Sequence, residues 1–441
     1  MKLKVVLWSV TVALGGFLFG YDTAVISGAE QAIQKLWGLS DGLHGFAVAI
    51  ALYGTVIGAM LGGIPADSLG RKKTLFWIGV LYFISALGSA LAPDIYTFMA
   101  FRFIGGLGVG ASSVVAPLYI SEISPANQRG RLVAIFQFNI VLGILIAFLC
   151  NYLIQLGAEE TPWRLMMGVE GVPALLFVFL VIFVPRSPRW LIVKKGLHDE
   201  AKKVLALINS DTVDESYNAI LKSAEQNDVS SVKDSLFSKK YSIPLLLAFL
   251  IAFFNQWSGI NAIIYYAPRI FELTGLGADS ALLSTSGVGF INLVFTMIGI
   301  TLIDKMGRKK LMFIGSVGLI ATLALVSNAF FTESYAFVPI YLFVYIAFFA
   351  MSQGAVIWVF ISEVFPNKVR ASGQSFGCFI HWIFAALIAN IFPFIVNKFS
   401  GGPLFAFFSF MMVLQLIFVW KMMPETKGKS LEQLEETISH G

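Results

Sequence analysis

Long apolar stretches alternate with short polar segments along the whole chain. A helix needs about 20 mainly apolar residues to cross the hydrocarbon core of a bilayer, so each stretch is long enough to span a membrane. The stretches fall at about 6–27, 44–66, 74–92, 97–120, 131–153, 164–184, 243–271, 281–303, 310–331, 337–362, 372–398 and 402–423. The pattern therefore predicts an all-α membrane protein with twelve transmembrane helices.

Composition supports a lipid environment. Hydrophobic residues make up 57% of the 441 positions and charged residues only 13%, whereas soluble domains hold roughly 25% charged residues. The first stretch is longer than the core of a signal peptide and carries Asp22, so we expect it to remain in the mature protein. Cys150 and Cys378 lie in different stretches without a partner at metal-ligand spacing. We interpret both as packing residues and expect neither a metal nor a cofactor.

The basic residues predict how the chain is oriented. Most of the 31 Lys and Arg lie at the two ends and in loops that follow even-numbered stretches, and such residues stay on the cytoplasmic side. Both termini are therefore expected in the cytoplasm, and the net charge of +5 reflects membrane topology rather than a nucleic-acid partner. Short loops and the absence of an N-terminal targeting segment favour a bacterial inner membrane.

Two loop motifs occur twice, in the same order. DSLGRKK at 67–73 recurs as DKMGRKK at 304–310, which is 237 positions later (304 − 67). SEISP at 121–125 recurs as SEVFP at 362–366, which is 241 positions later (362 − 121). Each copy follows the second or the fourth helix of a group of six, as a duplicated six-helix unit requires.

The duplication divides the chain into three parts. We expect a first six-helix half at 1–185, a polar cytoplasmic linker at 186–242 and a second half with a short tail at 243–441. Apolar positions at helical spacing in 199–208 predict short helices in the linker. In transporters built from such repeats, the substrate site lies between the halves near the middle of the membrane.

Five further motifs are specific enough to indicate a family. They are FGYDTAVISG at 19–28, RFIGGLGVG at 102–110, the Arg129-Gly130 pair, NQWSGINAIIYYAP at 255–268 and PETKG at 424–428. Together they resemble the sugar porters of the major facilitator superfamily over nearly the whole chain, and bacterial proton-coupled pentose and hexose symporters are the nearest type. The resemblance implies alternating access, with a monosaccharide and a proton as partners, by a protein expected to be a monomer in the lipid bilayer.

Other functions are weighed against this one. A uniporter would use the same cavity without coupling, and a sugar receptor would bind without transport, although the tail after residue 423 has no room for a signalling domain. An enzyme is disfavoured because no nucleophile lies beside a base and no phosphate loop is present.

A sugar site needs side chains that both donate and accept hydrogen bonds, as amides do, and aromatic faces for the apolar C–H surface. Such side chains match the family's sugar site at Phe19, Gln137, Asn255, Gln256, Asn261, Tyr265, Asn292, Gly354, Trp358, His381 and Trp382. Amides also serve as hydrogen-bonding contacts between membrane helices, and aromatic residues are abundant along the whole chain, so a purely structural role stays equally open for Asn292 and Phe19. Trp358 is also explained by packing alone.

The seventh predicted helix carries four of these groups, namely Asn255, Gln256, Asn261 and Tyr265. Asn261 and Tyr265 are four positions apart and share one helical face. Gln256 joins that face only if the helix is irregular near Gly259, as transporter helices often are where they line a cavity.

Charged residues inside the predicted spans indicate the mechanism. Asp22 lies in the first span and Arg102 near the start of the fourth, and a buried charge costs roughly 2.5–3.5 kcal/mol unless it is paired or hydrated. In the proton symporters that the chain resembles, the acid matching Asp22 carries the proton and the base matching Arg102 is its partner. Glu170 in the sixth span is a second acid that matches the family's pattern. A purely structural Asp22–Arg102 pair is the alternative.

Charged residues at the cytoplasmic helix ends are expected to form a gate. The resemblance implies salt bridges within and between the halves in the outward-open state, and exposed pairs worth about 0–1 kcal/mol suit a switch that must open. The predicted pairs are Glu122 with Arg129, Glu363 with Arg370, Asp67 with Arg71 and Asp304 with Arg308, and Arg189 is the remaining gate residue.

The chain also departs from the family's pattern. Arg186 replaces an acid in the segment after the sixth helix, which puts that part of the gate in doubt. Asn255 is one methylene shorter than the glutamine usual there, and Ala355 stands where a proline often follows Gly354. His381 replaces an amide that touches sugar, so it either alters sugar choice or supplies one hydrogen bond in place of the amide.

Overall fold

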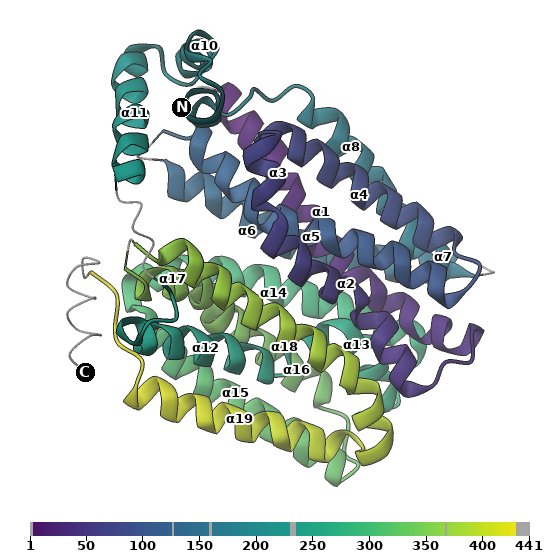
Figure 1. Cartoon of the computed structure of the whole chain (residues 1–441). Helices are drawn as coiled ribbons and strands as arrows, with labels where there is room; N and C mark the ends of the chain where they lie inside the picture. Colours follow the sequence, from purple (N-terminus) through teal and green to yellow (C-terminus); the bar gives the residue numbers. More distant parts are fainter. Residues whose placement is uncertain (1–2, 126–127, 158–160, 230–234, 367, 429–441) are drawn as a thin grey trace. The chain divides into compact units, whose positions relative to one another are not determined.

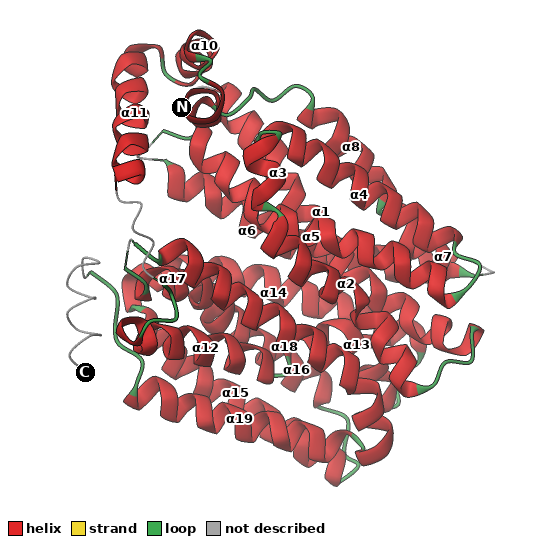
Figure 2. Cartoon of the chain, in the orientation of Figure 1, coloured by secondary structure: helices red, strands yellow, loops and turns green. Residues whose placement is uncertain are grey.

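The computed structural model describes residues 3–125, 128–157, 161–229, 235–366 and 368–428. These residues form helices joined by short loops, with no strand among them (Figures 1 and 2). Twelve helical segments of the described chain are long and apolar enough to cross a membrane, which confirms the predicted number of spans.

Contacts divide the chain into two compact units, which are Met1–Thr23, Gly54–Ile144 and Met167–Lys233 in the first and Ala24–Tyr53, Leu145–Met166 and Asp234–Gly441 in the second. The first unit contains α3 (Gly63–Ser68), α4 (Arg71–Leu91), α5 (Ile95–Ile123), α8 (Gly171–Val181), α9 (Pro188–Trp190), α10 (His198–Ile208) and α11 (Val213–Val229). The second contains α12 (Ser242–Trp257), α13 (Ile260–Leu273), α14 (Ala278–Met306), α15 (Arg308–Phe331), α16 (Val338–Phe349), α17 (Ala355–Val364), α18 (Arg370–Phe399) and α19 (Gly401–Lys421). Four helices contribute to both units, namely α1 (Leu3–Leu36), α2 (Asp41–Leu61), α6 (Arg129–Gly157) and α7 (Pro162–Val169).

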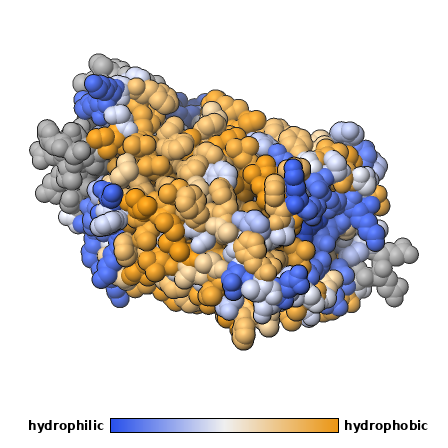
Figure 3. All heavy atoms as spheres, turned by 90° about the horizontal axis from the view of Figure 1, so that it is seen from below, coloured by the Kyte–Doolittle hydropathy of each residue, from blue (hydrophilic) through white to orange (hydrophobic). Residues whose placement is uncertain are grey.

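Large hydrophobic side chains remain exposed on the surface of the helices. On the face shown in Figure 3, hydrophobic residues cover the middle and hydrophilic residues gather toward the ends. Phe410 and Trp420 of α19 and Phe313 and Val317 of α15 are among the exposed residues. Such a surface suits hydrocarbon as the surrounding solvent, because large apolar patches are rare on soluble monomers.

Glycines allow the helices of the first unit to approach one another closely. A Cβ at Gly20 of α1 would collide with the backbone carbonyl of Ile140 in α6, and one at Gly143 of α6 would collide with the carbonyl of Phe17. Since hydrocarbon supplies little hydrophobic drive between helices, this backbone contact and the dispersion energy it allows hold α1 against α6.

Three spans are interrupted where they are buried. The seventh span breaks between α12 and α13 at Gly259, whose φ of +88° is left-handed, and this confirms the predicted irregularity. The sixth is divided at Glu170 between α7 and α8, although the φ of −56° and ψ of −28° at Glu170 stay in the helical range, and the tenth contains a π-helical turn at Ala350–Gly354. Non-helical backbone at membrane depth is tolerated where protein surrounds it, and it often lines a cavity.

The polar segment between the sixth and seventh spans folds into short helices, as predicted. The helix α10 covers the amphipathic stretch 199–208 and buries Ala201 and Val204 against Trp190 and Leu191. Ile208 and residues of α11, including Tyr217 and Leu221, pack on the same cluster. This cluster fixes the position of the Ser187–Trp190 turn.

The Gly20 contact gives a test of helix packing. Replacing Gly20 by Ala is expected to lower stability by about 1–3 kcal/mol, because the added methyl group must displace the backbone of α6. Thermal unfolding in detergent would measure the change. The control is Gly42→Ala, at a helical position where a Cβ meets nothing within 4 Å, and it should unfold like the wild type. An equal effect of both substitutions would contradict the packing explanation.

Candidate functional site

A buried cluster of three titratable side chains lies in the first unit. Arg102 of α5 donates from Nη1 to Oδ1 of Asp22 at 2.5 Å and from Nη2 to the backbone carbonyl of Asp22 at 3.0 Å. Glu170, at the break between α7 and α8, interacts electrostatically with both residues. All three are 1% exposed. The cluster can therefore hold a proton out of contact with bulk solvent.

The cluster is incompletely hydrogen-bonded, which is unusual for buried charges. Neither carboxylate oxygen of Glu170 has a hydrogen-bond partner among the described residues, and the same holds for Nε of Arg102 and the hydroxyl of Ser85. Gly105 makes room for the cluster, because a Cβ there would collide with Ser85 and come within 3.3 Å of Oδ1 of Asp22. The site has spare acceptors and donors for a proton or for a rearranged pair.

A second polar cluster lies in the second unit around Gln256. Its Nε2 donates to Oδ1 of Asn255 at 3.0 Å and lies 3.1 Å from Nδ1 and 3.2 Å from Nε2 of His381. Its Oε1 accepts from Nδ2 of Asn261 at 2.6 Å. Five positions along an unbroken helix would place Gln256 and Asn261 about 140° apart, so the break at Gly259 is what brings them together.

Aromatic rings surround the histidine of this cluster. The His381 ring lies 4.7 Å from the ring of Trp358 and 4.8 Å, edge to face, from that of Trp382. Trp358 follows the π-helical turn that ends at Gly354. The arrangement combines amide groups with flat apolar faces, which is the chemistry that a polyhydroxylated ring requires.

Four further predicted sugar-site residues are placed by burial and by their unit. Tyr265 and Asn292 are buried in the second unit, where Asn292 accepts a hydrogen bond from Thr296 at 3.4 Å. Phe19 and Gln137 belong to the first unit, on the closely packed helices α1 and α6. The structure therefore brings together Asn255, Gln256, Asn261, Trp358, His381 and Trp382.

In the first unit, the predicted gate residues form one network at the start of α4. Arg71 binds Glu122 through Nε and Nη2, at 3.0–3.2 Å, and Asp67 through Nη1, at 2.9 Å. The indole nitrogen of Trp190 donates to the carbonyl of Asp67 at 2.8 Å. The acid of the second repeated motif thus binds the base of the first.

The second unit repeats this network at the start of α15. Arg308 binds Glu363 through Nη2 at 2.8 Å and Nε at 3.1 Å, and reaches Asp304 at 3.4 Å. Two residues of the PETKG motif add to it. Thr426 donates to Glu363 at 2.6 Å, and Glu425 accepts from the backbone N–H groups of Arg308 and Lys309 at 2.9 and 3.1 Å.

Three predicted gate residues lie differently. Arg370 donates to the carbonyl of Phe365 at 3.4 Å, and the predicted pairing of Glu363 with Arg370 is wrong, since Glu363 binds Arg308 instead. Arg189 donates to Ser223 of α11 at 3.1 Å, which ties it to the short helices. The side chain of Arg129 lies outside the described residues.

A further buried charge cluster in the second unit was missed from the sequence. Glu30 of α1 is bound bidentately by Arg269 of α13, at 2.9 and 3.0 Å, and lies 2.9 Å from Nε2 of His44 in α2. Gln34 also accepts from Arg269. The predicted first helix ended at residue 27, whereas α1 continues to Leu36 and carries Glu30 into protein. Arg269 was the signal available in the sequence, because it is one of the few basic residues that do not lie at the expected cytoplasmic helix ends.

Among the described residues, no three His, Cys, Asp or Glu side chains gather as a metal site would require.

Glu425 gives a prediction about pH. Burial raises the pKa of this carboxyl, but hydrogen bonds from the backbone N–H groups of Lys427, Arg308 and Lys309 outweigh burial and hold the pKa below its ordinary value of 4.5. The stabilisation is therefore complete above pH 4.5 and is lost as the pH falls through the lower value of the folded state. Glu425→Gln should lower the melting temperature at pH 7, and the difference from the wild type should shrink below pH 4.5. Glu215→Gln, at an exposed position, is the control. A difference that does not change with pH would contradict this account.

Comparison with known proteins agrees with this arrangement. The family model described as "Sugar (and other) transporter" matches residues 8–438. The D-xylose transporter of Levilactobacillus brevis is 38% identical, with 97% of this chain and 94% of that protein covered. The D-xylose-proton symporter of Escherichia coli strain K12 is 36% identical, with 97% and 95% covered.

A solved structure shows the same fold. The xylose transporter XylE from E. coli in its inward-open conformation matches with a TM-score of 0.86 and 35% identity, over 97% of this chain and 98% of that one. With twelve spans, a family model covering nearly every residue and relatives aligned end to end, the chain belongs to the sugar transporter family of the major facilitator superfamily.

Proposed function

We propose that this protein is a proton-coupled symporter that carries a monosaccharide across a bacterial inner membrane by alternating access. The observation that carries the proposal is the buried Asp22–Arg102 pair beside Glu170. Intramembrane acids are costly and mark proton pathways by default. A relative named for D-xylose–proton symport supports the same function.

The three side chains of the cluster suggest how a proton would change the pairing. A proton on Asp22 removes the charge that attracts Arg102. Arg102 then needs another acceptor, because a buried cation without one is strongly destabilised. Glu170 has two free oxygens and already interacts with Arg102, so it can take over as the partner. Protonation would thus move Arg102 between two acids on different helices and shift α1 relative to α5.

Sugar binding is assigned to the amide cluster of the second unit. Gln256 uses both ends of its amide on Asn255, Asn261 and His381. Each of these contacts can be exchanged for a sugar hydroxyl, which both donates and accepts. Trp358 and Trp382 supply apolar faces for the ring carbons. Xylose is the first sugar to test, since the relatives carry that name.

The two ends of the spans supply the proposed gates. Within the second unit, Glu30 binds Arg269 and Asp41 accepts from Asn397 at 2.8 Å, so the outer parts of α1 and α2 are tied to α13 and α18. We assign these contacts to the periplasmic gate. The networks around Arg71 and Arg308 lie at basic helix ends, and the positive-inside rule places those ends and both termini in the cytoplasm.

Asp22→Asn should separate coupling from transport. In proteoliposomes loaded without sugar, the wild type is expected to accumulate labelled xylose when the proton gradient is inward. The variant should lose this accumulation but keep counterflow exchange, because an amide cannot carry the proton.

Asp279→Asn, at an exposed position of α14, should accumulate sugar like the wild type. If the wild type only equilibrates its substrate whatever the gradient, the protein is a uniporter and Asp22 with Arg102 is a structural pair.

His381 should contribute directly to sugar affinity. His381→Ala removes the partner of Gln256 and the ring between two tryptophans, so the dissociation constant for the transported sugar should rise about tenfold. His381→Gln restores an amide and should recover most of the affinity. Equilibrium binding to purified protein would measure both, with Ser375→Ala, exposed on the same helix, as the control. Unchanged affinity in His381→Ala would limit this residue to a packing role.

A further inference from the structure

The two repeats differ at the N-terminus of one pair of equivalent helices, α4 in the first repeat and α15 in the second. Gly70 before α4 and Gly307 before α15 have the same backbone conformation, with φ of 89° and 88° and ψ of 155° and 165°. At α15, the first two N–H groups donate to the carboxylate of Glu425. This repeat shows directly that an oxyanion fits the site formed by these two N–H groups.

At α4 the corresponding acid is absent. The segment that reads Pro424-Glu425-Thr426 in the second repeat reads Pro185-Arg186-Ser187 in the first. The N–H groups of Arg71 and Lys72 at the start of α4 have no acceptor among the described residues, and no side chain caps the helix. Unpaired N–H groups and the helix dipole make such a terminus attractive to anions.

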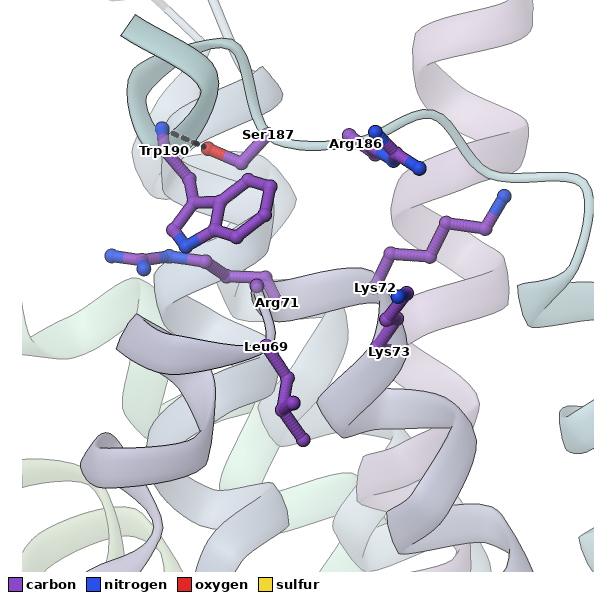
Figure 4. Close-up of a pocket in the computed structure, with 8 residues that line it drawn as sticks. Leu69, Arg71, Lys72, Lys73, Arg186, Ser187 and Trp190 are labelled. Atoms are coloured by element: carbon purple, nitrogen blue, oxygen red, sulfur yellow. Dashed lines mark hydrogen bonds between the residues drawn. The ribbon is translucent and has the colours of Figure 1, made fainter. Parts of the chain in front are cut away.

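A pocket of about 110 Å³ remains at this position. That volume is several times the roughly 30 Å³ that a water molecule occupies in the liquid. Figure 4 shows it bounded by Lys72, Lys73 and Arg186, with Ser187 and Trp190 on the other side. None of its lining residues is acidic.

The basic side chains at the pocket are largely not neutralised. Lys72 donates to the backbone carbonyl of Ile182 at 2.7 Å, which leaves its charge uncompensated. Arg186 makes one exposed contact, at 3.5 Å, with Glu200. The guanidinium of Arg71 is directed away from the pocket, toward Glu122 and Asp67. Arg71 therefore contributes its backbone N–H group to the pocket rather than its side-chain charge.

An apolar groove of about 360 Å³ continues from this pocket and shares Lys72 and Lys73 with it. Phe76, Trp77, Val181 and Ile182 form its walls. Trp77 is 56% exposed and Ile182 51% exposed, and both lie near the ends of helices long and apolar enough to cross a membrane. A basic pocket followed by an apolar groove matches a molecule with an anionic head and a hydrocarbon chain.

We propose that this site binds an anionic phospholipid, with its phosphate at the start of α4 and an acyl chain along the groove beside Trp77. Phosphates bind readily at helix N-termini, and basic pockets beside membrane helices bind anionic headgroups. The lipid phosphate takes the place that Glu425 occupies in the other repeat. Because α4 carries Arg71, the lipid supports the helix end from which Arg71 binds Glu122.

Native mass spectrometry of the delipidated full-length protein would test this, with phosphatidylglycerol, phosphatidylcholine and inorganic phosphate as separate probes. Phosphatidylglycerol should bind about tenfold more tightly than phosphatidylcholine, because only the former carries net charge to the basic side chains. Arg186→Glu should weaken its binding tenfold or more, since the new carboxylate can cover the free N–H groups. Arg186→Gln, which only removes a charge, should weaken it several-fold and serves if the first variant folds poorly.

Two matched variants define the site. Lys73→Gln should weaken phosphatidylglycerol binding several-fold, whereas Lys310→Gln, the same change in the repeat already capped by Glu425, should alter it less than twofold. Trp77→Ala should weaken lipid binding and leave binding of inorganic phosphate unchanged. Unchanged lipid affinity in both Arg186 variants would overturn the site. Inorganic phosphate binding as tightly as the lipid, with no effect of Trp77→Ala, would overturn the lipid as its ligand.

Discussion

Every polar group buried in the membrane must find its partner within the protein, because hydrocarbon offers none. This constraint explains why two of the buried acids are held by arginines from other helices, and why Glu170 is exceptional, since its oxygens have no hydrogen-bond partner among the described residues. Asp22 is bound by Arg102, and Glu30 by Arg269. Each pair joins two spans, so the demands of charge burial also decide which helices lie together. A change of protonation at such a pair therefore changes helix packing, which gives the proposed proton coupling its physical basis.

The two halves share the same charge network but differ in the contacts at the helix start beside it. In both, an arginine at a helix start binds the acid that follows another helix, as Arg71 binds Glu122 and Arg308 binds Glu363. Only the second repeat closes its helix start with a carboxylate of its own, from Glu425. Arg186 leaves the equivalent place in the first repeat open. Duplication thus preserved the charge network while each copy became free to change what lies around it.

Much of the fold followed from the hydrophobic pattern, because spans are long and lipid imposes a minimum length on them. The break at Gly259 could also be predicted, since Gln256 and Asn261 share a face only if the helix is irregular. The end of the first helix could not, because α1 leaves the apolar stretch and continues within protein to Leu36, so Glu30 was overlooked. Spacing alone could not decide that Glu363 is bound by Arg308 rather than by Arg370, which depends on how helices cross. The roles of the proposed sugar and proton residues stay predictions.

The Glu30–Arg269 pair has a consequence for how the chain is made. Its two residues are 239 positions apart, and at a synthesis rate of about 5–20 residues per second, roughly 12–48 s pass between their emergence from the ribosome. During that interval Arg269, the arginine that binds Glu30 in the finished protein, has not yet been made. His44 follows Glu30 by only 14 positions and lies against it in the finished protein, so it is the partner that can be present from the start. Of the two partners of Glu30, His44 is therefore the one that is synthesised close to it in time.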